Sequence, residues 1–308
     1  MSPKLDHASP ATRCGLIALV GAPNVGKSTL INALVGERVG IVSSKPNTTR
    51  IVVRGVVTEG ATQFVFVDTP GLNTSAKAFD RALVQQAQGS LAEADVVALV
   101  IDAGRGFDDR AMDIVARIQQ GKRTAVLIIN KVDRLVPRER VLPLMTRAAE
   151  LGCFAEVLAV AAANVNKKGG GGMKDVLPRL AKYVPEGPWL FPADMATDMP
   201  LYQRLAEITR EQVMTYMHEE VPYAIAVVTD SVDDSGMPWL VQQRILLTRE
   251  AHKPLVIGKG GSMLGRMGTA AREVMQDVLG TGVRLELHVE VSPDWQERAH
   301  LLYPAGDE

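Results

Sequence analysis

A glycine-bounded loop between an apolar run and a helical pattern is the stretch of the chain best suited to chemistry. It covers residues 21–28, Gly-Ala-Pro-Asn-Val-Gly-Lys-Ser, and follows the apolar run 16–20. Glycine at both ends lets the backbone wrap round a polyphosphate, and the N–H groups and dipole of a following helix favour an anion. Lys27 is expected to reach the outer phosphates and Ser28 to supply a hydroxyl to Mg²⁺. The stretch therefore predicts a nucleotide phosphate site. The predicted phosphate contacts are Gly21, Ala22, Pro23, Asn24, Val25, Gly26, Lys27, Ser28 and Thr29.

A second polar stretch, Asp68-Thr69-Pro70-Gly71, follows the strand pattern of residues 63–67. A carboxylate at the end of that strand can hold Mg²⁺ through water, and the Gly71 N–H can contact a terminal phosphate. Alone, these four residues would be an ordinary turn. Together with the loop around Lys27, they predict that Asp68, Thr69, Pro70 and Gly71 bind the nucleotide.

The polar segment 43–50 lies between these two motifs and is expected to be a switch that responds to the γ-phosphate. One of its threonines should close on Mg²⁺. We favour Thr49, with Thr48 as the alternative, because sequence does not fix the register of the loop. The predicted metal ligands are therefore Ser28, Thr49 and Asp68.

A third motif, Asn130-Lys131-Val132-Asp133, ends the apolar strand pattern 125–129 and predicts guanine recognition. The Asp133 carboxylate can accept two hydrogen bonds from guanine that adenine does not offer, while Lys131 lies along the base. The alternative is a surface turn in which Asp133 caps the next helix. Backbone N–H groups of Ala161 and Ala162 are expected to meet the guanine carbonyl. The three motifs occur in the order of the translation-factor class of GTPases, which the chain resembles.

Two positions near the predicted phosphate site bear on hydrolysis. Small GTPases carry a glutamine after the Asp-x-x-Gly motif, but this chain carries Leu72, so intrinsic hydrolysis is expected to be slow. Asn24 matches the asparagine with which potassium-activated GTPases hold a monovalent cation. We therefore predict stimulation by K⁺, with Lys27, Asn24 and Thr49 as the residues that act in catalysis.

Composition sets wide limits on the rest of the chain. A length of 308 residues favours two domains, and 46% hydrophobic with 22% charged residues is an ordinary composition for a folded protein that can bury a core. No apolar run is long enough to span a membrane, and residues 1–13 lack the apolar core of a signal peptide, which predicts a cytoplasmic protein. Only Cys14 and Cys153 are present, and both are expected to be buried thiols.

Strand and helix patterns alternate from residue 15 to about residue 184, which predicts βαβ units. The expected fold class is an α/β P-loop GTPase domain, a mostly parallel sheet with helices on both faces, followed by a small α+β type II KH domain. The predicted boundaries are a disordered N-terminal tail at 1–13, a GTP-binding domain at 14–184, a linker at 185–200, a KH domain at 201–292 and a C-terminal tail at 293–308. The glycine-rich segment 166–172 is expected to be mobile.

The second domain contains a G-x-x-G loop, Gly258-Lys259-Gly260-Gly261, between a short apolar stretch and an amphipathic helix. Such a loop can bring its backbone against an RNA sugar-phosphate while bases lie in an apolar groove, which Ile257, Leu264 and Met267 could line. Between residues 244 and 272 there are six basic residues and one acid, a basic strip suited to single-stranded RNA, although a solvated helix face is the alternative. The predicted RNA contacts are Ile257, Gly258, Lys259, Gly260, Gly261, Leu264 and Arg266. The six basic residues of the strip are Arg244, Arg249, Lys253, Lys259, Arg266 and Arg272.

Taken together, the motifs resemble the Era family of bacterial ribosome-assembly GTPases, a branch of the TrmE-Era-EngA-like GTPases, over residues 14–291. The resemblance implies GTP-gated binding to the 3′ end of small-subunit ribosomal RNA and assistance to assembly of the 30S subunit. It also implies peripheral association at the inner face of the cell membrane, and we expect the protein to be a monomer. Two other functions compete with this one. A P-loop kinase would have no use for the guanine motif, and a nucleotide-insensitive RNA-binding module would not need intact phosphate and metal contacts.

Overall fold

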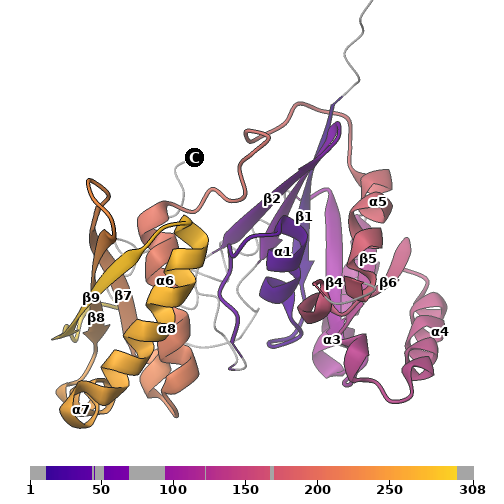
Figure 1. Ribbon diagram of the computed structural model, residues 1–308. Helices are drawn as coiled ribbons and strands as arrows, with labels where there is room; N and C mark the ends of the chain where they lie inside the picture. Colours follow the sequence, from indigo (N-terminus) through magenta and orange to yellow (C-terminus); the bar gives the residue numbers. More distant parts are fainter. Residues whose placement is uncertain are drawn as a thin grey trace, which may run out of the picture. The chain divides into compact units, whose positions relative to one another are not determined.

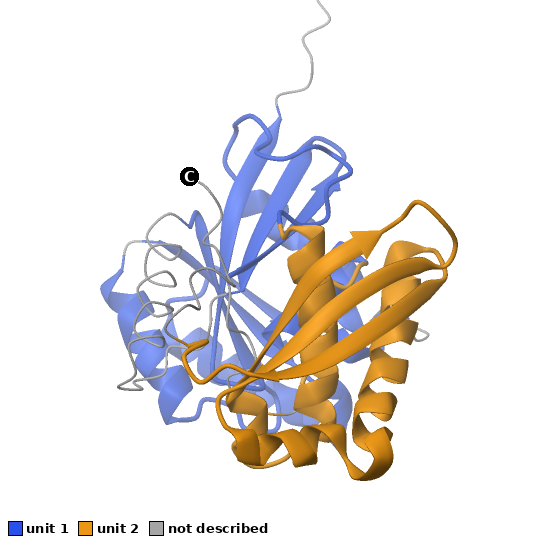
Figure 2. Ribbon diagram, turned by 90° about the vertical axis from the view of Figure 1, so that its left-hand side faces the viewer, with its two compact units in different colours: residues 1–36, 52–72, 85–198 blue, residues 37–51, 73–84, 199–308 orange. Residues whose placement is uncertain are grey.

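The structure of the protein is a computed structural model that describes residues 12–43, 45, 52–68, 94–121, 123–166 and 170–296. The chain forms two compact units (Figure 2). Unit 1 comprises residues 1–36, 52–72 and 85–198, and unit 2 comprises residues 37–51, 73–84 and 199–308. The helix that we predicted over 79–93 lies outside the described residues, as do residues 1–11 of the predicted N-terminal tail.

Unit 1 is built on a six-stranded sheet in the order β2-β3-β1-β4-β5-β6 (Figure 1). Its neighbouring strands are parallel except for β2, which runs antiparallel to β3. The strands are β1 (Arg13–Val20), β2 (Val53–Glu59), β3 (Thr62–Asp68), β4 (Val96–Asp102), β5 (Thr124–Asn130) and β6 (Glu156–Ala159). The predicted mostly parallel sheet is confirmed. β1 begins at Arg13, which we had placed in the tail.

Helices cover both faces of this sheet, as predicted. They are α1 (Lys27–Val35), α3 (Asp109–Gln120), α4 (Val141–Leu151) and α5 (Val176–Leu180). Residues of α3 and α4 pack against Leu99 and Leu127 on one face. Val100 and Ile128, which point to the opposite face, are also fully buried. Both faces of the central strands are therefore in the core, which explains why their sequences are apolar throughout.

The segment that we predicted as a linker is bound along unit 1 as far as Asp198. The buried side chain of Gln63 accepts hydrogen bonds from the N–H groups of Leu190, at 2.9 Å, and Phe191, at 3.0 Å. The Val56 N–H donates to the carbonyl oxygen of Ala196 at 2.9 Å. Only two residues, 199 and 200, then separate this bound segment from the next helix.

Unit 2 has the element order α-β-β-α-α-β of a type II KH domain, as predicted. The elements are α6 (Leu201–Tyr216), β7 (Ile225–Asp233), β8 (Trp239–Leu247), α7 (Lys253–Ile257), α8 (Ser262–Leu279) and β9 (Val283–Val291). The sheet order is β7-β8-β9, with β7 antiparallel and β9 parallel to β8. Side chains of α6 and α8 form one core with the inward residues of the sheet, such as Ile225 and Ile245.

The other face of this sheet is partly covered by the end of the described chain. Trp295, in the segment that we assigned to a C-terminal tail, is 2% exposed and packs on Ala226 and Leu246. Its indole N–H donates to the carbonyl oxygen of Ala224 at 3.3 Å. The folded part of unit 2 therefore extends past residue 292, so that our predicted boundary was too early.

Candidate functional site

The loop between β1 and α1 has the backbone that a phosphate cradle needs. Gly21 has φ +153° and Gly26 has φ +99°, and a Cβ on Gly21 would lie 2.3 Å from the carbonyl oxygen of Val100. A Cβ on Gly26 would lie 2.4 Å from the amide nitrogen of Asn130. Both positions therefore require glycine, for conformation and for space. Asn24 also adopts a positive φ, of 64°.

Lys27, the first residue of α1, folds back over this loop. Its side chain is buried, with Nζ 3.0 Å from the carbonyl oxygen of Gly21 and 3.4 Å from that of Ala22. Burial lowers the pKa of the Lys27 ammonium, an effect that the negative charge of Asp68 opposes. This buried cation lies against two carbonyl oxygens of the loop and under the electrostatic influence of the Asp68 carboxylate, and it is well placed to meet an anion.

Ser28 and Asp68 come together at the carboxyl ends of β1 and β3. The Ser28 hydroxyl donates to Oδ2 of Asp68 at 2.6 Å, and the Asp68 side chain is fully buried. A hydroxyl beside a carboxylate is a set of hard oxygen donors of the kind that Mg²⁺ prefers. These two predicted ligands therefore fit the metal. The predicted third ligand, Thr49, lies outside the described residues, together with Thr48, Thr69, Pro70, Gly71 and Leu72.

Asn130, the last residue of β5, joins the predicted guanine and phosphate motifs. Its side-chain amide nitrogen donates to the carbonyl oxygen of Val25 in the phosphate loop at 2.9 Å. Its amide oxygen accepts from the N–H groups of Lys131, at 2.8 Å, and Ala162, at 3.1 Å. The side chain is 2% exposed, so all three hydrogen bonds are sheltered from water. Asn130 thus fixes three motifs in one arrangement.

Lys131 adds a second connection, to a residue that we did not predict. Its ammonium forms an ion pair with Asp102 at 2.8 Å and donates to the carbonyl oxygen of Asn24. Burial raises the pKa of the Asp102 carboxyl, but hydrogen bonds from Lys131 and the Gly104 N–H outweigh this and hold it below its usual value. The sequence signal was present, since Asp102 directly follows the apolar residues of β4. Asp133, the third predicted guanine contact, is exposed.

The segment predicted to contact the guanine carbonyl is held by other partners. The Ala161 N–H donates to the carbonyl oxygen of Gly171 at 2.7 Å, and the Ala162 N–H donates to Asn130. A Cβ on Gly171 would lie 2.5 Å from the Ala161 carbonyl oxygen, and one on Gly172 would lie 2.6 Å from that of Ala159. The prediction of a mobile glycine run is therefore wrong for Gly171 and Gly172, which pack against this segment; residues 167–169 lie outside the described residues.

The G-x-x-G loop of unit 2 joins α7 to α8 and presents an open backbone. Gly258 has φ +73°, and a Cβ there would lie 2.7 Å from that of Met263. Gly260 and Gly261 also have positive φ, but a Cβ on either would have nothing within 4 Å. Lys259, between Gly258 and Gly260, is exposed. One glycine is thus required by the fold, whereas the other two leave a bare backbone that another molecule can approach.

Two side chains beside this loop are half-buried, as an apolar groove requires. They are Ile257 and Leu264. Met267, which we also placed in the groove, is fully buried in the core of unit 2, so that prediction is wrong. The reason is the phase of α8: Met267, Ala271 and Met275 follow one another at four-residue steps on the face that packs inward.

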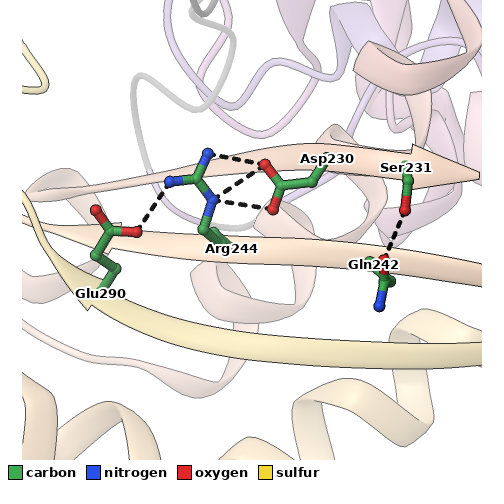
Figure 3. A network of polar contacts seen from close by, with 5 residues as sticks. All are labelled: Asp230, Ser231, Gln242, Arg244 and Glu290. Carbon is green, nitrogen blue, oxygen red and sulfur yellow. Dashed lines mark hydrogen bonds and ion pairs between the residues drawn. The ribbon is translucent and has the colours of Figure 1, made fainter.

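The predicted basic strip is shorter than the sequence indicated. Arg266 is exposed and lies over the ring of Tyr216, 5.0 Å from its centroid. Arg244 does not belong with it, because it points away from the helices on the outer face of the sheet. There its guanidinium pairs with Asp230 at 2.8 Å and Glu290 at 2.9 Å (Figure 3). Val241, Gln243 and Ile245 point inward, so alternation along β8 explains the error.

Comparison with known families and proteins agrees with the architecture of both units. The family described as "50S ribosome-binding GTPase" matches residues 16–131, and the KH domain family matches residues 220–296. GTPase Era from Bradyrhizobium sp. (strain ORS 278) is 41% identical over 296 residues, which cover 96% of this chain and 94% of that protein. GTPase Era from Afipia carboxidovorans is 43% identical, over 94% of this chain and 92% of that protein.

Solved structures resemble the chain over the same extent. A crystal structure of Era with MgGDPNP and nucleotides 1506–1542 of 16S ribosomal RNA has a TM-score of 0.87 and 37% identity. It matches 95% of this chain and 99% of that chain. A structure of an Aquifex aeolicus Era variant bound to GDP and AlF4⁻ has the same TM-score, identity and coverage. Near-complete coverage at this identity shows that the chain belongs to the Era family of GTPases.

Proposed function

We propose that this GTPase is a switch that binds the 3′ end of small-subunit ribosomal RNA through its KH domain and assists assembly of the 30S subunit. The observation that carries the proposal is the joining of the guanine and phosphate motifs through Asn130, in a chain that also presents an open G-x-x-G loop. A guanine-reading site adds nothing to a P-loop kinase. A decayed nucleotide site would not retain buried lysine, carboxylate and amide groups that each bond to the phosphate loop. The RNA bound by the related Era structure supports the choice of target.

In this proposal, the residues of unit 1 have separate parts in the reaction. The Lys27 ammonium neutralises charge that develops on the transferred phosphoryl group. Glycine N–H groups of the loop cradle the phosphates, and Asp133 selects guanine. Ser28, Asp68 and the predicted Thr49 hold Mg²⁺, which supplies charge neutralisation at the β- and γ-phosphates when bound. The related structure with MgGDPNP supports this assignment of the metal.

We further propose that K⁺ raises the rate of hydrolysis through Asn24. Asn24 has a positive φ within the phosphate loop, and its own backbone carbonyl oxygen accepts a hydrogen bond from the Lys131 ammonium. A monovalent cation there would supply positive charge that a chain with Leu72 in place of glutamine lacks. Steady-state turnover in KCl should exceed turnover in NaCl, and Asn24→Ala should remove the difference. Equal turnover in the two salts would exclude this role.

The partners and location follow from the same proposal. We expect a cytoplasmic monomer that associates peripherally with the inner face of the cell membrane. In the part of the chain that the structure describes, no helix is both long enough and apolar enough to cross a bilayer. Flotation with vesicles of anionic lipid would measure the peripheral association, and sedimentation equilibrium would measure the oligomeric state.

The test of the switch is the affinity of the full chain for a short RNA that matches the 3′ end of small-subunit ribosomal RNA. It should be measured with a non-hydrolysable GTP analogue and with GDP, at one salt concentration. Tighter binding with the GTP analogue supports the proposal. Equal affinities would leave a GTPase and an RNA-binding domain on one chain without a switch. Replacing GTP by ATP in the turnover assay tests guanine selection.

A further inference from the structure

Residues 37–45 join the helix that begins at Lys27 to the segment that carries the predicted metal-binding threonine. They leave α1 directly after its C-cap, Gly36, whose φ is +80°. Although they lie between two elements of unit 1 in the sequence, they belong to the compact unit that contains α6 (Figure 2). The structure describes 37–43 and 45 of this segment, and these residues contact α6 at several points.

Glu211, on α6, is the centre of these contacts. It forms an ion pair with Arg38 and accepts a hydrogen bond from the Val42 N–H at 3.2 Å. The Glu211 side chain is 7% exposed. Burial raises the pKa of its carboxyl, and this outweighs the lowering by Arg38 and by the Val42 N–H. Removing one partner of such a buried charge is costly, so the carboxylate strongly favours the bound position of the segment.

Two further sets of contacts join residues 37–45 to the two ends of α6. The Lys45 ammonium donates to the carbonyl oxygens of Met214 and Met217, where a cation also interacts favourably with the helix dipole. Near the start of the helix, Arg204 donates to the carbonyl oxygen of Arg38 at 2.9 Å and pairs with Glu37 at 3.0 Å. The segment is therefore held along most of the length of α6.

The opposite side of α6 packs against the RNA-binding part of unit 2. Ala206 and Val213 lie in the same core as Met267 of α8, and Arg266 of α8 stacks on Tyr216. At about 100° per residue, Glu211 lies about 150° round the helix from these two core positions. α6 thus has the segment on one side and, on the other, the helix that begins at the G-x-x-G loop.

We propose that Glu211 is a positioning residue that couples the nucleotide to RNA binding, by clamping residues 37–45 to α6. The inference rests on the proposed switch and names the residues that transmit it. Thr49 follows residues 37–45 in the chain, so in this proposal its movement toward Mg²⁺ acts on residues that α6 holds. The part of the nucleotide-binding free energy that depends on residues 37–45 therefore also depends on α6. By linkage, RNA must change nucleotide affinity by the same factor as nucleotide changes RNA affinity.

The test is a double-mutant cycle on the full chain. Arg38→Gln, Glu211→Gln and the double variant are compared with the parent chain by the ratio of RNA affinities in the GTP-analogue and GDP states. Glu290→Gln is the matched control, because it also removes a carboxylate from an arginine pair of unit 2 but touches neither the segment nor α6 (Figure 3). We expect a parent ratio in the range of about 5 to 150 that falls to within about twofold of 1 in the three clamp variants. The double variant should resemble either single variant, because both act through one pair.

Each outcome has a distinct meaning. Clamp variants that retain the parent ratio would overturn the role of Glu211 and leave the switch intact. A parent ratio of 1 would overturn the switch itself, and the clamp with it. Thermal unfolding identifies a variant that fails to fold. If a variant fails to fold, hydrogen exchange of the Val42 N–H in the parent chain tests the role of Glu211 instead. Its protection must differ between the GTP-analogue and GDP states if the contact with Glu211 responds to nucleotide, and equal protection would overturn the proposal.

Discussion

The two ligand sites of this protein are built in opposite ways. In unit 1, Lys27, Asp68 and Asn130 are all less than 10% exposed and are joined to the phosphate loop or to one another by short hydrogen bonds. In unit 2, Lys259 is exposed, and open space surrounds the Cα positions of Gly260 and Gly261. The first site is held by its own network before any ligand arrives, whereas the second is an exposed backbone.

This difference matches what each site has to do. Hydrolysis needs charges placed to within a fraction of an ångström in a site that admits the attacking water but excludes bulk solvent, so the network must be buried and mutually supported. Binding a flexible single strand needs close approach of a sugar-phosphate backbone, which bare glycine permits. Substitutions in the unit 1 site should therefore change stability and activity together, and substitutions in the G-x-x-G loop of unit 2 should change binding more than stability.

Lys27→Met should have the largest effect. It removes the cation that we propose meets the developing phosphoryl charge, so turnover of GTP should fall by about 10³-fold or more. The pKa of Lys27 is lowered in the folded protein, so its charge lowers the free energy of unfolding. This cost is present in full at every pH below the folded-state pKa. The methionine variant should accordingly unfold at a higher temperature, with about 1 kcal/mol of added stability at pH 7. Lys182→Met, at an exposed lysine, is the control and should change neither quantity. A less stable Lys27→Met protein would contradict this account.

Glycine-to-alanine substitution at the two sites tests the comparison most directly. Gly21→Ala places a Cβ 2.3 Å from a backbone oxygen and should lower the free energy of unfolding by about 3 kcal/mol or more, with loss of nucleotide binding. Gly260→Ala meets no atom within 4 Å and should cost only about 1 kcal/mol, from its φ of +61°. Denaturant unfolding measures both costs. RNA affinity should nevertheless fall about tenfold for Gly260→Ala. Similar stability losses in the two variants would show that the sites do not differ as described.

Much of this architecture can be predicted from the sequence, because it depends on local patterns. Apolar runs predicted the ends of the strands to within three residues, and the G-x-x-x-x-G-K-S stretch located the phosphate loop. The errors at Met267 and Arg244 concern side-chain direction. Helical phase and strand alternation carry that information, but only once the inward face of each element is known.

The rest depends on contacts between residues far apart in the sequence. Nothing in the composition of residues 185–198 shows that the buried amide of Gln63 binds their backbone. Likewise, the glycines at 171 and 172 look like a flexible run until Ala159 and Ala161 are seen against them. From the sequence alone, Glu211 is indistinguishable from any other carboxylate on a helix, because its partner Arg38 is 173 residues away.

Asp102→Asn should have a moderate effect, since it removes the charge that pairs with Lys131 in the predicted guanine site. The pKa of Asp102 is lowered in the folded state, so its stabilising effect is present above pH 3.8 and is lost as pH falls through the folded-state pKa. The variant should be about 2 kcal/mol less stable than the parent at pH 7, and the difference should shrink below pH 3.8. Urea unfolding at pH 7 and pH 3 measures this. A difference that is independent of pH would mean that the charge of Asp102 is not what stabilises the fold.

Lys259→Gln should have the smallest effect and should leave unit 1 unchanged. An exposed lysine that meets one phosphate contributes mainly through counterion release, so the slope of log affinity against log salt should decrease in magnitude by about 0.7. RNA affinity near 0.1 M salt should fall by only about threefold to fivefold, while GTP turnover and thermal stability stay at the parent values. The measurement is a salt titration of RNA binding, with Lys174→Gln in unit 1 as the matched control. An unchanged slope would remove Lys259 from the RNA interface and confine that interface to the glycine backbone. A loss of stability would show that unit 2, like unit 1, relies on its ligand-binding residues to fold.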